Sequence, residues 1–427
     1  MNKRIAIVTG IRTPFCKGNG LLKDWQADDL GAFALKELMA RAPVKASSID
    51  EVILGNVLQP SHATNIARVI AVKAGLPVTI PAYTVNRNCS SGMEAVASAS
   101  NKIWLGQADI IIAGGVESMS NFPILFPNKM KDFLMGLSKA RSFTEKLRAI
   151  LKFRPSLLYP QIPEIADPLC GLSMGQTAEI LSREFKITRE EQDQFALKSQ
   201  LNAAKAEENG RFLEEIAPIL LPPECKSYQT KDDGPRAGQT LEALASLKPV
   251  FDKLTGSVTA GNSSPITDGA CALLVMSEEK AKELGLKPLG YLTAYAEAGL
   301  DPARMGLGPT YAIAKLLRET KHSIKDIELF EINEAFAAQV LANLKALNSK
   351  EFAQTHLGQQ EAVGILNPDL LNVNGGAIAL GHPLGSSGAR LILTLLLEMK
   401  RRKKHLGIAS LCIGGGQGQA ALLEVDI

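Results

Sequence analysis

The chain has 427 residues, which is too long for one simple hydrophobic core and predicts two or three domains. Its net charge of +3 gives no overall polybasic character, so the composition does not indicate a nucleic-acid-binding protein. Hydrophobic residues make up 46% and charged residues 21%, the ordinary balance of a globular protein.

The cysteines indicate a reducing compartment. No two of them form a Cys-x-x-Cys pair, so their spacing is typical of neither a disulfide framework nor a zinc site. The six are Cys16, Cys89, Cys170, Cys225, Cys271 and Cys412. We therefore expect a cytoplasmic location, since the apolar run near the N-terminus is too short for a signal peptide. No stretch reaches the roughly 20 apolar residues that span a bilayer.

Strand-like and helix-like segments alternate through the first 120 residues, which predicts an α/β fold. Strands are expected over residues 5–9, 51–55, 82–85 and 109–113, and helices over residues 29–41, 65–74 and 95–103. Between residues 121 and 249 this alternation stops. Two helices are expected over 173–208, the second opened by the capping-box pattern Thr188-Arg189-Glu190-Glu191.

A second alternation follows residue 250. Strands are expected over residues 271–276, 289–296, 327–332 and 407–411, and helices over residues 310–319, 334–347 and 389–400. Ser90-Ser91-Gly92 and Ser386-Ser387-Gly388 each precede a helix, a strand and a glycine run, which indicates an internal duplication. We predict a first half formed by residues 1–120 with 250–283, an inserted loop domain over 121–249, and a second half over 284–427.

Cys89 lies in a turn between an extended segment and a helix of small residues. Outward-pointing N–H groups and the positive helix end favour a thiolate, which predicts a lowered cysteine pKa. The plainer interpretation is a small buried side chain, the commonest role of a free cysteine.

Three more stretches follow predicted strands, at the strand ends where α/β folds gather their sites. They are Asn333-Glu334-Ala335-Phe336, Gly381-His382-Pro383 and Cys412-Ile413-Gly414. Taken singly, His382 is better interpreted as a structural histidine and Cys412 as a core residue. Taken together with Cys89, these stretches supply a nucleophile (Cys89), a base (His382), a second acid/base (Cys412) and backbone donors for an oxyanion.

This combination of motifs resembles the thiolase family, and within it the degradative type that is the thiolase subunit of a fatty-acid oxidation complex. The resemblance covers nearly the whole chain and implies a duplicated, layered α-β-α-β-α fold with an inserted loop domain. The matching stretches are Asn88-Cys89-Ser90-Ser91-Gly92, Gly114-Gly115-Val116-Glu117-Ser118-Met119-Ser120, Ala260-Gly261-Asn262-Ser263-Ser264, Asn333-Glu334-Ala335-Phe336, Gly375 to Pro383, and Cys412 to Gly416.

The resemblance implies a role for each catalytic position. Cys89 is the nucleophile that takes the acyl group, and His382 activates it. Asn333 acts through a water and forms one oxyanion hole with His382, whereas the N–H groups of Cys89 and Gly414 form the other. Cys412 moves the proton at the substrate's alpha carbon and on the incoming thiol.

The resemblance also implies the reaction, which is cleavage of 3-ketoacyl-CoA by coenzyme A through an acyl-cysteine, giving acetyl-CoA in fatty-acid β-oxidation. Ser264 and Arg236 match coenzyme A contacts, and Met174 matches a residue that lines the site. Coenzyme A is a substrate here, so we expect no metal and no other cofactor. The family implies at least a homodimer, with a hydratase/dehydrogenase subunit as a candidate partner.

Three alternatives stay open. The same residues catalyse acetoacetyl-CoA synthesis from two acetyl-CoA molecules. A ketoacyl synthase shares the duplicated fold, but those enzymes usually pair the nucleophile with two histidines or with histidine and asparagine, so Cys412 argues against this alternative. A non-catalytic acyl-CoA-binding protein would have no need of Cys89, His382 and Asn333 together. Asn333 replaces the histidine frequent in long-chain complexes, and Ser173 replaces the histidine usual in short-chain biosynthetic enzymes.

The segment from Asn121 to Arg154 carries eight basic residues and two acidic ones. Ser142 and Glu145 form a capping-box pattern, after which apolar residues recur on one helical face. Such a helix is expected to cover the acyl site or face a partner subunit. The alternative hypothesis is peripheral contact with an anionic membrane.

Overall fold

A computed structural model describes residues 4–160 and 166–427 of the chain and confirms the predicted α/β fold. The strands are β1 Ile5–Arg12, β2 Cys16–Lys17, β3 Glu51–Gly55, β4 Ala82–Val85, β5 Ile110–Glu117, β6 Ile219–Leu220, β7 Tyr228–Gln229, β8 Thr267–Ser277, β9 Gly290–Gly299, β10 Leu329–Ile332, β11 Leu406–Ile413 and β12 Gln417–Glu424.

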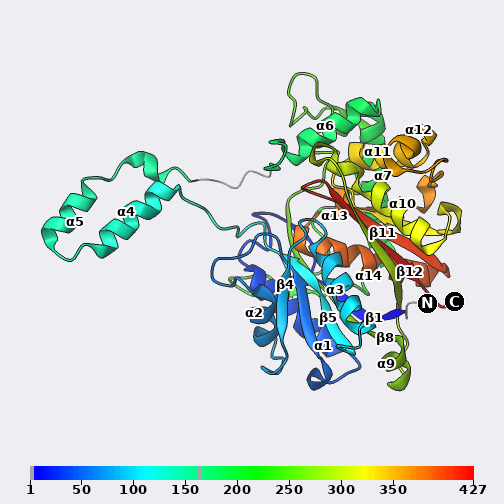
Figure 1. Cartoon of the computed structure of the whole chain (residues 1–427), viewed down its shortest axis with the longest axis horizontal. Helices are drawn as coiled ribbons and strands as arrows, with labels where there is room; N and C mark the ends of the chain where they lie inside the picture. The colour runs from blue at the N-terminus through cyan, green and yellow to red at the C-terminus, as the bar shows by residue number, and fades with distance from the viewer. Residues whose placement is uncertain (1–3, 161–165) are drawn as a thin grey trace.

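Helices pack against the strands of the sheet (Figure 1). They are α1 Ala27–Arg41, α2 Ile66–Lys73, α3 Ser91–Trp104, α4 Asn128–Lys139, α5 Phe143–Ile150, α6 Met174–Glu184, α7 Arg189–Glu208, α8 Leu241–Ala245, α9 Glu278–Glu283, α10 Gly308–Thr320, α11 Ala337–Leu347, α12 Lys350–Phe352, α13 Ala377–Leu380 and α14 Leu384–Arg402. Among these residues, no helix combines the length and apolar character needed to cross a membrane.

The strand pairing shows the duplication. In the described chain, one ten-stranded sheet runs in the order β10-β11-β12-β9-β1-β8-β5-β3-β4, with β2 beside β8. In the first half, β1 pairs antiparallel with β8, β8 antiparallel with β5, and β5 parallel with β3. In the second half, β9, β12, β11 and β10 repeat this series of pairings. The halves join where β1 and β9 pair antiparallel. Because β8 pairs with strands of the first half, the chain returns there after the insertion; the exact domain boundaries stay predictions.

The helices α3 and α14 pack against each other and against strands of the sheet. An amphipathic surface helix buries one stripe, whereas α14 buries every residue from Gly385 to Met399. Glycine is required where the two helices meet. A Cβ atom at Gly92 would lie 2.9 Å from both Ala389 N and Gly385 O, and one at Gly388 would overlap the backbone of Met93. The repeated Ser-Ser-Gly motif therefore brings the first turns of α3 and α14 into backbone contact.

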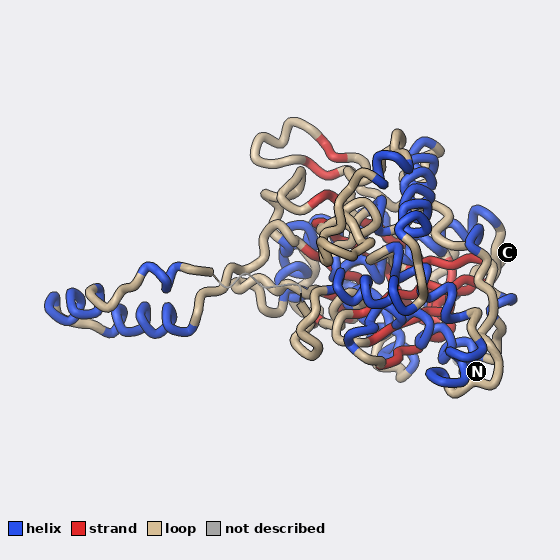
Figure 2. The backbone as a smooth tube through the Cα atoms, turned by 90° about the horizontal axis from the view of Figure 1, so that it is seen from above, coloured by secondary structure: helices blue, strands red, loops and turns tan. Residues whose placement is uncertain are grey.

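The α4–α5 arm, which we define as residues 121–160, extends away from the rest of the chain (Figures 1 and 2). Its second helix opens with the predicted capping box, in which Ser142 Oγ accepts from Glu145 N. None of the described residues of α4 and α5 is buried. In this arrangement the arm does not cover the core of the fold.

Three predictions of local structure differ from the observed fold. The helix expected over residues 389–400 begins at Leu384, so Ser386-Ser387-Gly388 lies inside α14 and does not precede it. The helix expected from Glu334 begins only at Ala337, because the buried Glu334 carboxylate is bonded to Ser199 Oγ at 2.6 Å and Asn372 Nδ2 at 2.7 Å. Strand β12 was not predicted. It carries glutamine at alternate positions and runs beside β11 and β9, so its partners rather than its composition determine it.

Candidate active site

The turn between β4 and α3 holds Cys89 two residues before the helix begins. Asn88 adopts the left-handed conformation with φ of 45°, which reverses the chain. Ser90 N donates to Arg87 O at 3.0 Å, and Ser91 N donates to Asn88 O at 3.0 Å. These bonds fix Cys89 in a tight turn with its side chain half-buried.

Backbone donors from both halves meet at the Cys89 sulfur. The backbone N–H groups of Gly414 and of Cys89 itself face the thiol and lower its pKa. The Gly414 loop is held in turn by Asn88, whose side-chain amide donates to Gly414 O at 2.8 Å. The structure thus brings Cys89 and Gly414 together, with two N–H donors beside the Cys89 sulfur.

The expected thiolate is the wrong resting state for Cys89. Burial raises the pKa of the Cys89 thiol to about 11, the charge of Glu117 raises it further, and the two N–H groups only partly offset this. Desolvation disfavours the charged form, and here it exceeds the effect of the helix end and the amide dipoles. Cys89 is therefore a neutral thiol at pH 7.

Cys412 lies near the end of β11, fully buried. Burial raises the pKa of its thiol, and the neighbouring Cys89 adds to the shift. It belongs to an apolar cluster with Val258, Met305 and Phe336, against which Met174 packs. The second thiol is therefore neutral, dry and close to the first.

His382 lies between α13 and α14, two residues before α14 begins and buried. Its Nδ1 lies 2.7 Å from Ser387 Oγ, whose hydroxyl donates to Pro383 O at 2.9 Å. The Ser387 hydrogen is thus used, which assigns a hydrogen to His382 Nδ1 and leaves Nε2 as an acceptor. Asn333 Nδ2 faces Nε2 at 3.3 Å. In this tautomer the Nε2 lone pair faces Asn333 Nδ2 and can accept a proton.

Burial, followed by the charge of Arg390, lowers the pKa of His382 to about 3. The imidazole is therefore neutral at pH 7, as a proton acceptor must be. Because the first turns of α3 and α14 touch, Cys89 and His382 lie at adjoining helix N-termini.

The three residues predicted to bind substrate differ in position. Met174 opens α6, and its Sδ would lie 3.3 Å from a Cβ at Gly414, so it lines the site. Ser264 is half-buried, and its N–H donates to Ala335 O at 3.0 Å, beside the Asn333 segment. Arg236 is exposed, with its backbone N–H donating to Gln200 Oε1 at 2.9 Å. The coenzyme A contacts of Ser264 and Arg236 stay predictions.

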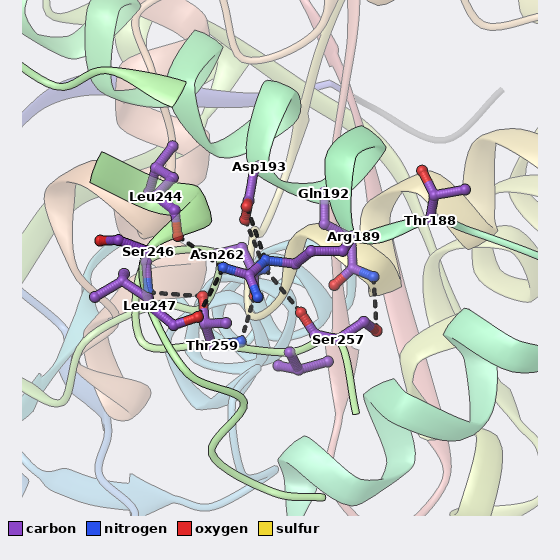
Figure 3. Close-up of polar contacts among 12 residues, drawn as sticks. Thr188, Arg189, Gln192, Asp193, Leu244, Ser246, Leu247, Ser257, Thr259 and Asn262 are labelled. Carbon is purple, nitrogen blue, oxygen red and sulfur yellow. Dashed lines mark hydrogen bonds and ion pairs between the residues drawn. The ribbon is translucent and has the colours of Figure 1, made fainter. Parts of the chain in front are cut away.

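A buried polar network holds the loop that leads to Ser264 (Figure 3). Asn262 Oδ1 accepts from Thr259 N at 2.8 Å, and Asn262 Nδ2 donates to Asp193 Oδ1 at 3.0 Å. Arg189 Nε donates to the other Asp193 oxygen at 2.7 Å, and its Nη2 donates to Leu244 O at 2.7 Å. Helix α7 of the inserted domain therefore fixes the conformation of the loop.

Sequence reasoning missed Asp167, a buried carboxylate in the irregular part of the insertion. Its Oδ2 accepts from Gly415 N at 2.7 Å and its Oδ1 accepts from Leu169 N at 2.8 Å. It thereby holds the loop that carries Gly414. An aspartate before a proline in a region without periodicity gave no signal of this role.

Together the arrangement offers two neutral thiols, a neutral imidazole and two N–H donors at one sulfur. Such a site can deprotonate a thiol as it attacks a carbonyl and can stabilise the resulting oxyanion. Among the described residues, no group of three or more histidine, cysteine, aspartate or glutamate side chains could hold a metal ion.

The family model for the thiolase N-terminal domain matches residues 5–279, and that for the thiolase C-terminal domain matches residues 286–425. The chain is 42% identical to a 3-ketoacyl-CoA thiolase of Aeromonas salmonicida over 425 residues, covering 99% of this chain and 97% of that protein. A 3-ketoacyl-CoA thiolase of Serratia proteamaculans is 43% identical over 426 residues, with the same coverage.

Solved structures show the same likeness. The Bacillus anthracis acetyl-CoA acetyltransferase has a TM-score of 0.85 at 41% identity, covering 99% of this chain and 100% of that one. The human mitochondrial 3-ketoacyl-CoA thiolase in complex with CoA has a TM-score of 0.85 at 37% identity, covering 100% of this chain and 98% of that one.

Proposed function

The chain belongs to the thiolase family, and from that premise we propose that it is an acyltransferase that cleaves 3-ketoacyl-CoA with coenzyme A in fatty-acid β-oxidation. The observation that carries the proposal is the Cys89 sulfur, which faces the N–H groups of Cys89 and Gly414 with the Cys412 thiol beside it. Acyl transfer through a cysteine needs these donors and this second acid.

In the first half-reaction, His382 Nε2 accepts the Cys89 proton while the sulfur attacks C3 of the substrate. The neutral resting pair means that deprotonation accompanies the attack instead of preceding it. The alkoxide formed at C3 collapses, and the C2–C3 bond breaks. The electron pair of the C2–C3 bond stays with C2, so acetyl-CoA leaves as its enolate. The enolate carbon then takes the proton of Cys412. The products are acetyl-CoA and an acyl-Cys89 thioester.

In the second half-reaction, the Cys412 thiolate takes the proton of an incoming coenzyme A thiol. The coenzyme A sulfur attacks the acyl-Cys89 carbonyl, whose oxygen receives hydrogen bonds from Cys89 N and Gly414 N. The shortened acyl-CoA leaves, and His382 returns its proton to Cys89. One thioester replaces another, so this half-reaction is near balance and ping-pong kinetics follow. No step requires a metal or redox cofactor.

The direct test is coenzyme A-dependent thiolysis of 3-ketoacyl-CoA substrates from short to long chain. Rates that rise with chain length support the degradative reaction. Activity confined to acetoacetyl-CoA would assign the chain to acetoacetyl-CoA synthesis and breakdown. Acyl-CoA binding without turnover would indicate a binding protein.

We also propose that the α4–α5 arm contacts a surface outside this chain. It carries an excess of basic residues and exposes large apolar side chains, including Phe143 at 80% and Leu151 at 76% exposure. Lys129, Lys139 and Arg148 line a hollow of the arm. Basic and apolar groups together suit an anionic membrane surface. Co-sedimentation with anionic liposomes tests this, and binding unchanged by deletion of residues 139–154 would exclude it; loss of a partner subunit in the same deletion would indicate a protein surface.

The proposed assembly is at least a homodimer, with a hydratase/dehydrogenase subunit as candidate partner and a cytoplasmic location. Strand β4 is the terminal strand of the sheet and leads directly to Cys89. Light scattering on the purified chain tests the dimer, because a monomer at micromolar concentration would contradict it.

A further inference from the structure

Glu117 ends strand β5 with its side chain fully buried between the two halves. Its Oε1 accepts from Asn56 Nδ2 and Leu58 N, both at 3.0 Å. Its Oε2 accepts from Val57 N at 3.1 Å and Gly385 N at 2.9 Å. All four partners are donors, so only the ionised carboxylate satisfies them; a protonated acid would direct its O–H at an N–H group.

Gly385 belongs to the first turn of α14, where backbone N–H groups have no partner within the helix. A carboxylate is favoured at this positive helix end. The site is closely packed, since a Cβ atom at Gly385 would lie 2.9 Å from Gly55 O and overlap Val116 O. Glu117 thus joins the ends of β3 and β5 in the first half to the start of α14 in the second.

The same first turn orients the proposed base. His382 precedes α14, and its Nδ1 is bonded to Ser387 Oγ within that turn. Glu117 acts on the turn from the half that carries Cys89, and its charge also acts on the Cys89 thiol. Movement of the turn therefore moves the imidazole relative to the nucleophile.

We propose that Glu117 is a positioning residue for acyl transfer, whose ionised carboxylate fixes the first turn of α14 and so holds the His382 imidazole against the half that carries Cys89. The inference rests on the proposed thiolysis reaction. Glu117 touches neither substrate nor the reacting atoms in this role; it acts through the Gly385 amide.

The contact between the Glu117 carboxylate and the first turn of α14 is expected to depend on pH. Burial raises the pKa of Glu117 to about 7, although the N–H groups of Leu58, Val57 and Gly385 lower it. The charge of Asp268 on β8 also raises the pKa of Glu117, and the charge of Glu117 in turn raises the pKa of the Cys89 thiol. The 56–58 loop and the first turn of α14 present N–H donors and the Asn56 amide. Protonation of Glu117 near neutral pH takes an acceptor away from the N–H groups of the 56–58 loop and of Gly385. Turnover should therefore fall on the acid side of pH 7.

The test measures kcat and KM for thiolysis from about pH 5.5 to 9 in the full chain, with thermal unfolding of each variant. Glu117→Gln places an amide NH₂ against two of the N–H donors, and Glu117→Asp keeps the charge on a shorter arm. Glu215→Gln is the matched control. Glu215 is also a buried carboxylate bonded to α14, but through Thr394 Oγ1 at 2.9 Å, far from the first turn, and it pairs with Arg12.

We expect Glu117→Gln to lower kcat about 10- to 100-fold at pH 8, the cost of a misplaced catalytic group, with KM for coenzyme A little changed. It should also lose the acid-side fall near pH 7. Glu117→Asp should lower kcat and keep that fall. Glu215→Gln should unfold at lower temperature and keep the kcat and pH profile of the unmodified enzyme.

Three results would overturn the inference. They are a wild-type kcat without an acid-side fall near pH 7, a Glu117→Gln variant with unchanged kcat and pH profile, and a loss of activity in Glu117→Gln and Glu117→Asp accounted for by unfolding alone. Should Glu117→Gln not fold, the wild-type profile and Glu117→Asp decide the matter. A wild-type chain without thiolysis activity contradicts the proposed function instead.

Discussion

The two central helices start from the same Ser-Ser-Gly motif and present different chemistry at their first turns. Before α3, a sharp turn leaves Cys89 half-buried and directs N–H groups at its sulfur. Before α14, His382 is buried, bonded to its own helix through Nδ1 and facing Asn333 through Nε2. In the proposed reaction, one half of the duplication supplies the sulfur that attacks the carbonyl carbon and the other half supplies its base.

Burial acts on the side chains of both turns and shifts their pKa values in opposite directions. Burial raises the pKa of the Cys89 thiol to about 11 and lowers that of the His382 imidazole to about 3. Each shift favours the neutral form. Without substrate, the site therefore holds a neutral thiol and a neutral imidazole and no thiolate–imidazolium pair.

Cys89→Ala gives the largest expected effect, because it removes the nucleophile of the first turn. Thiolysis should fall by about 10⁵-fold or more, as for other enzymes that lose a covalent nucleophile. Steady-state assay with acetoacetyl-CoA and coenzyme A measures it. Cys225→Ala, an exposed cysteine between β6 and β7, should leave the rate unchanged; equal losses in both variants would show that Cys89 has no special role.

Cys412→Ala separates proton transfer from nucleophile reactivity. Turnover should fall by about 10²- to 10⁴-fold, the usual range for a lost general acid or base. The rate of Cys89 alkylation by iodoacetamide should stay near that of the unmodified enzyme, because the N–H donors at its sulfur remain. Wild-type turnover in this variant would argue against Cys412 as the acid.

Gly388→Ala tests the contact that brings the two turns together. The new methyl group would overlap the backbone of Met93, so the free energy of unfolding should fall by about 3 kcal/mol. Chemical denaturation measures the change. Gly136→Ala in α4 has open space around the new methyl and should be neutral or slightly stabilising; similar losses at both positions would contradict the close helix contact.

The His382 shift predicts a smaller effect on stability. The folded pKa of about 3 lies below the ordinary value of 6.5, so the unfolded chain binds the proton first as the pH falls. Stability due to His382 is therefore complete above pH 6.5 and is lost below it, by about 2 kcal/mol at pH 5.

The comparison of wild type with His382→Asn isolates this contribution. Glu117 has a raised folded pKa and acts in the opposite direction over the same pH range, but it is present in both proteins. The difference in unfolding free energy between the two proteins should change by about 2 kcal/mol from pH 7 to pH 5. A difference independent of pH would mean that His382 titrates normally in the folded chain.

Much of the site follows from the sequence. The turn of Cys89 and the capping boxes at Ser142 and Thr188 are local patterns with local causes. His382 and Cys412 were expected to follow strands, but His382 lies between α13 and α14 and Cys412 lies within β11. The predicted shift of the Cys89 pKa was wrong in direction. Helix ends and N–H groups can be inferred from the local sequence, whereas desolvation depends on which distant residues pack over the thiol.

Long-range partners explain the rest of what was missed. Asp167 acquires its role from Gly415, which follows it by some 250 residues, and Glu117 acquires its role from Gly385. Strand β12 exists because β9 and β11 flank it. None of these pairings leaves a periodicity or spacing in the sequence.

In the proposed reaction, the Cys89 sulfur of the first half carries the acyl group. Intact-protein and peptide mass spectrometry can detect this acyl group after the chain is mixed with a 3-ketoacyl-CoA and no free coenzyme A. We expect a covalent adduct of the shortened acyl group on the Cys89 peptide, with one acetyl-CoA released per adduct. Turnover without any adduct, or with the acyl group on Cys412 instead, would contradict it.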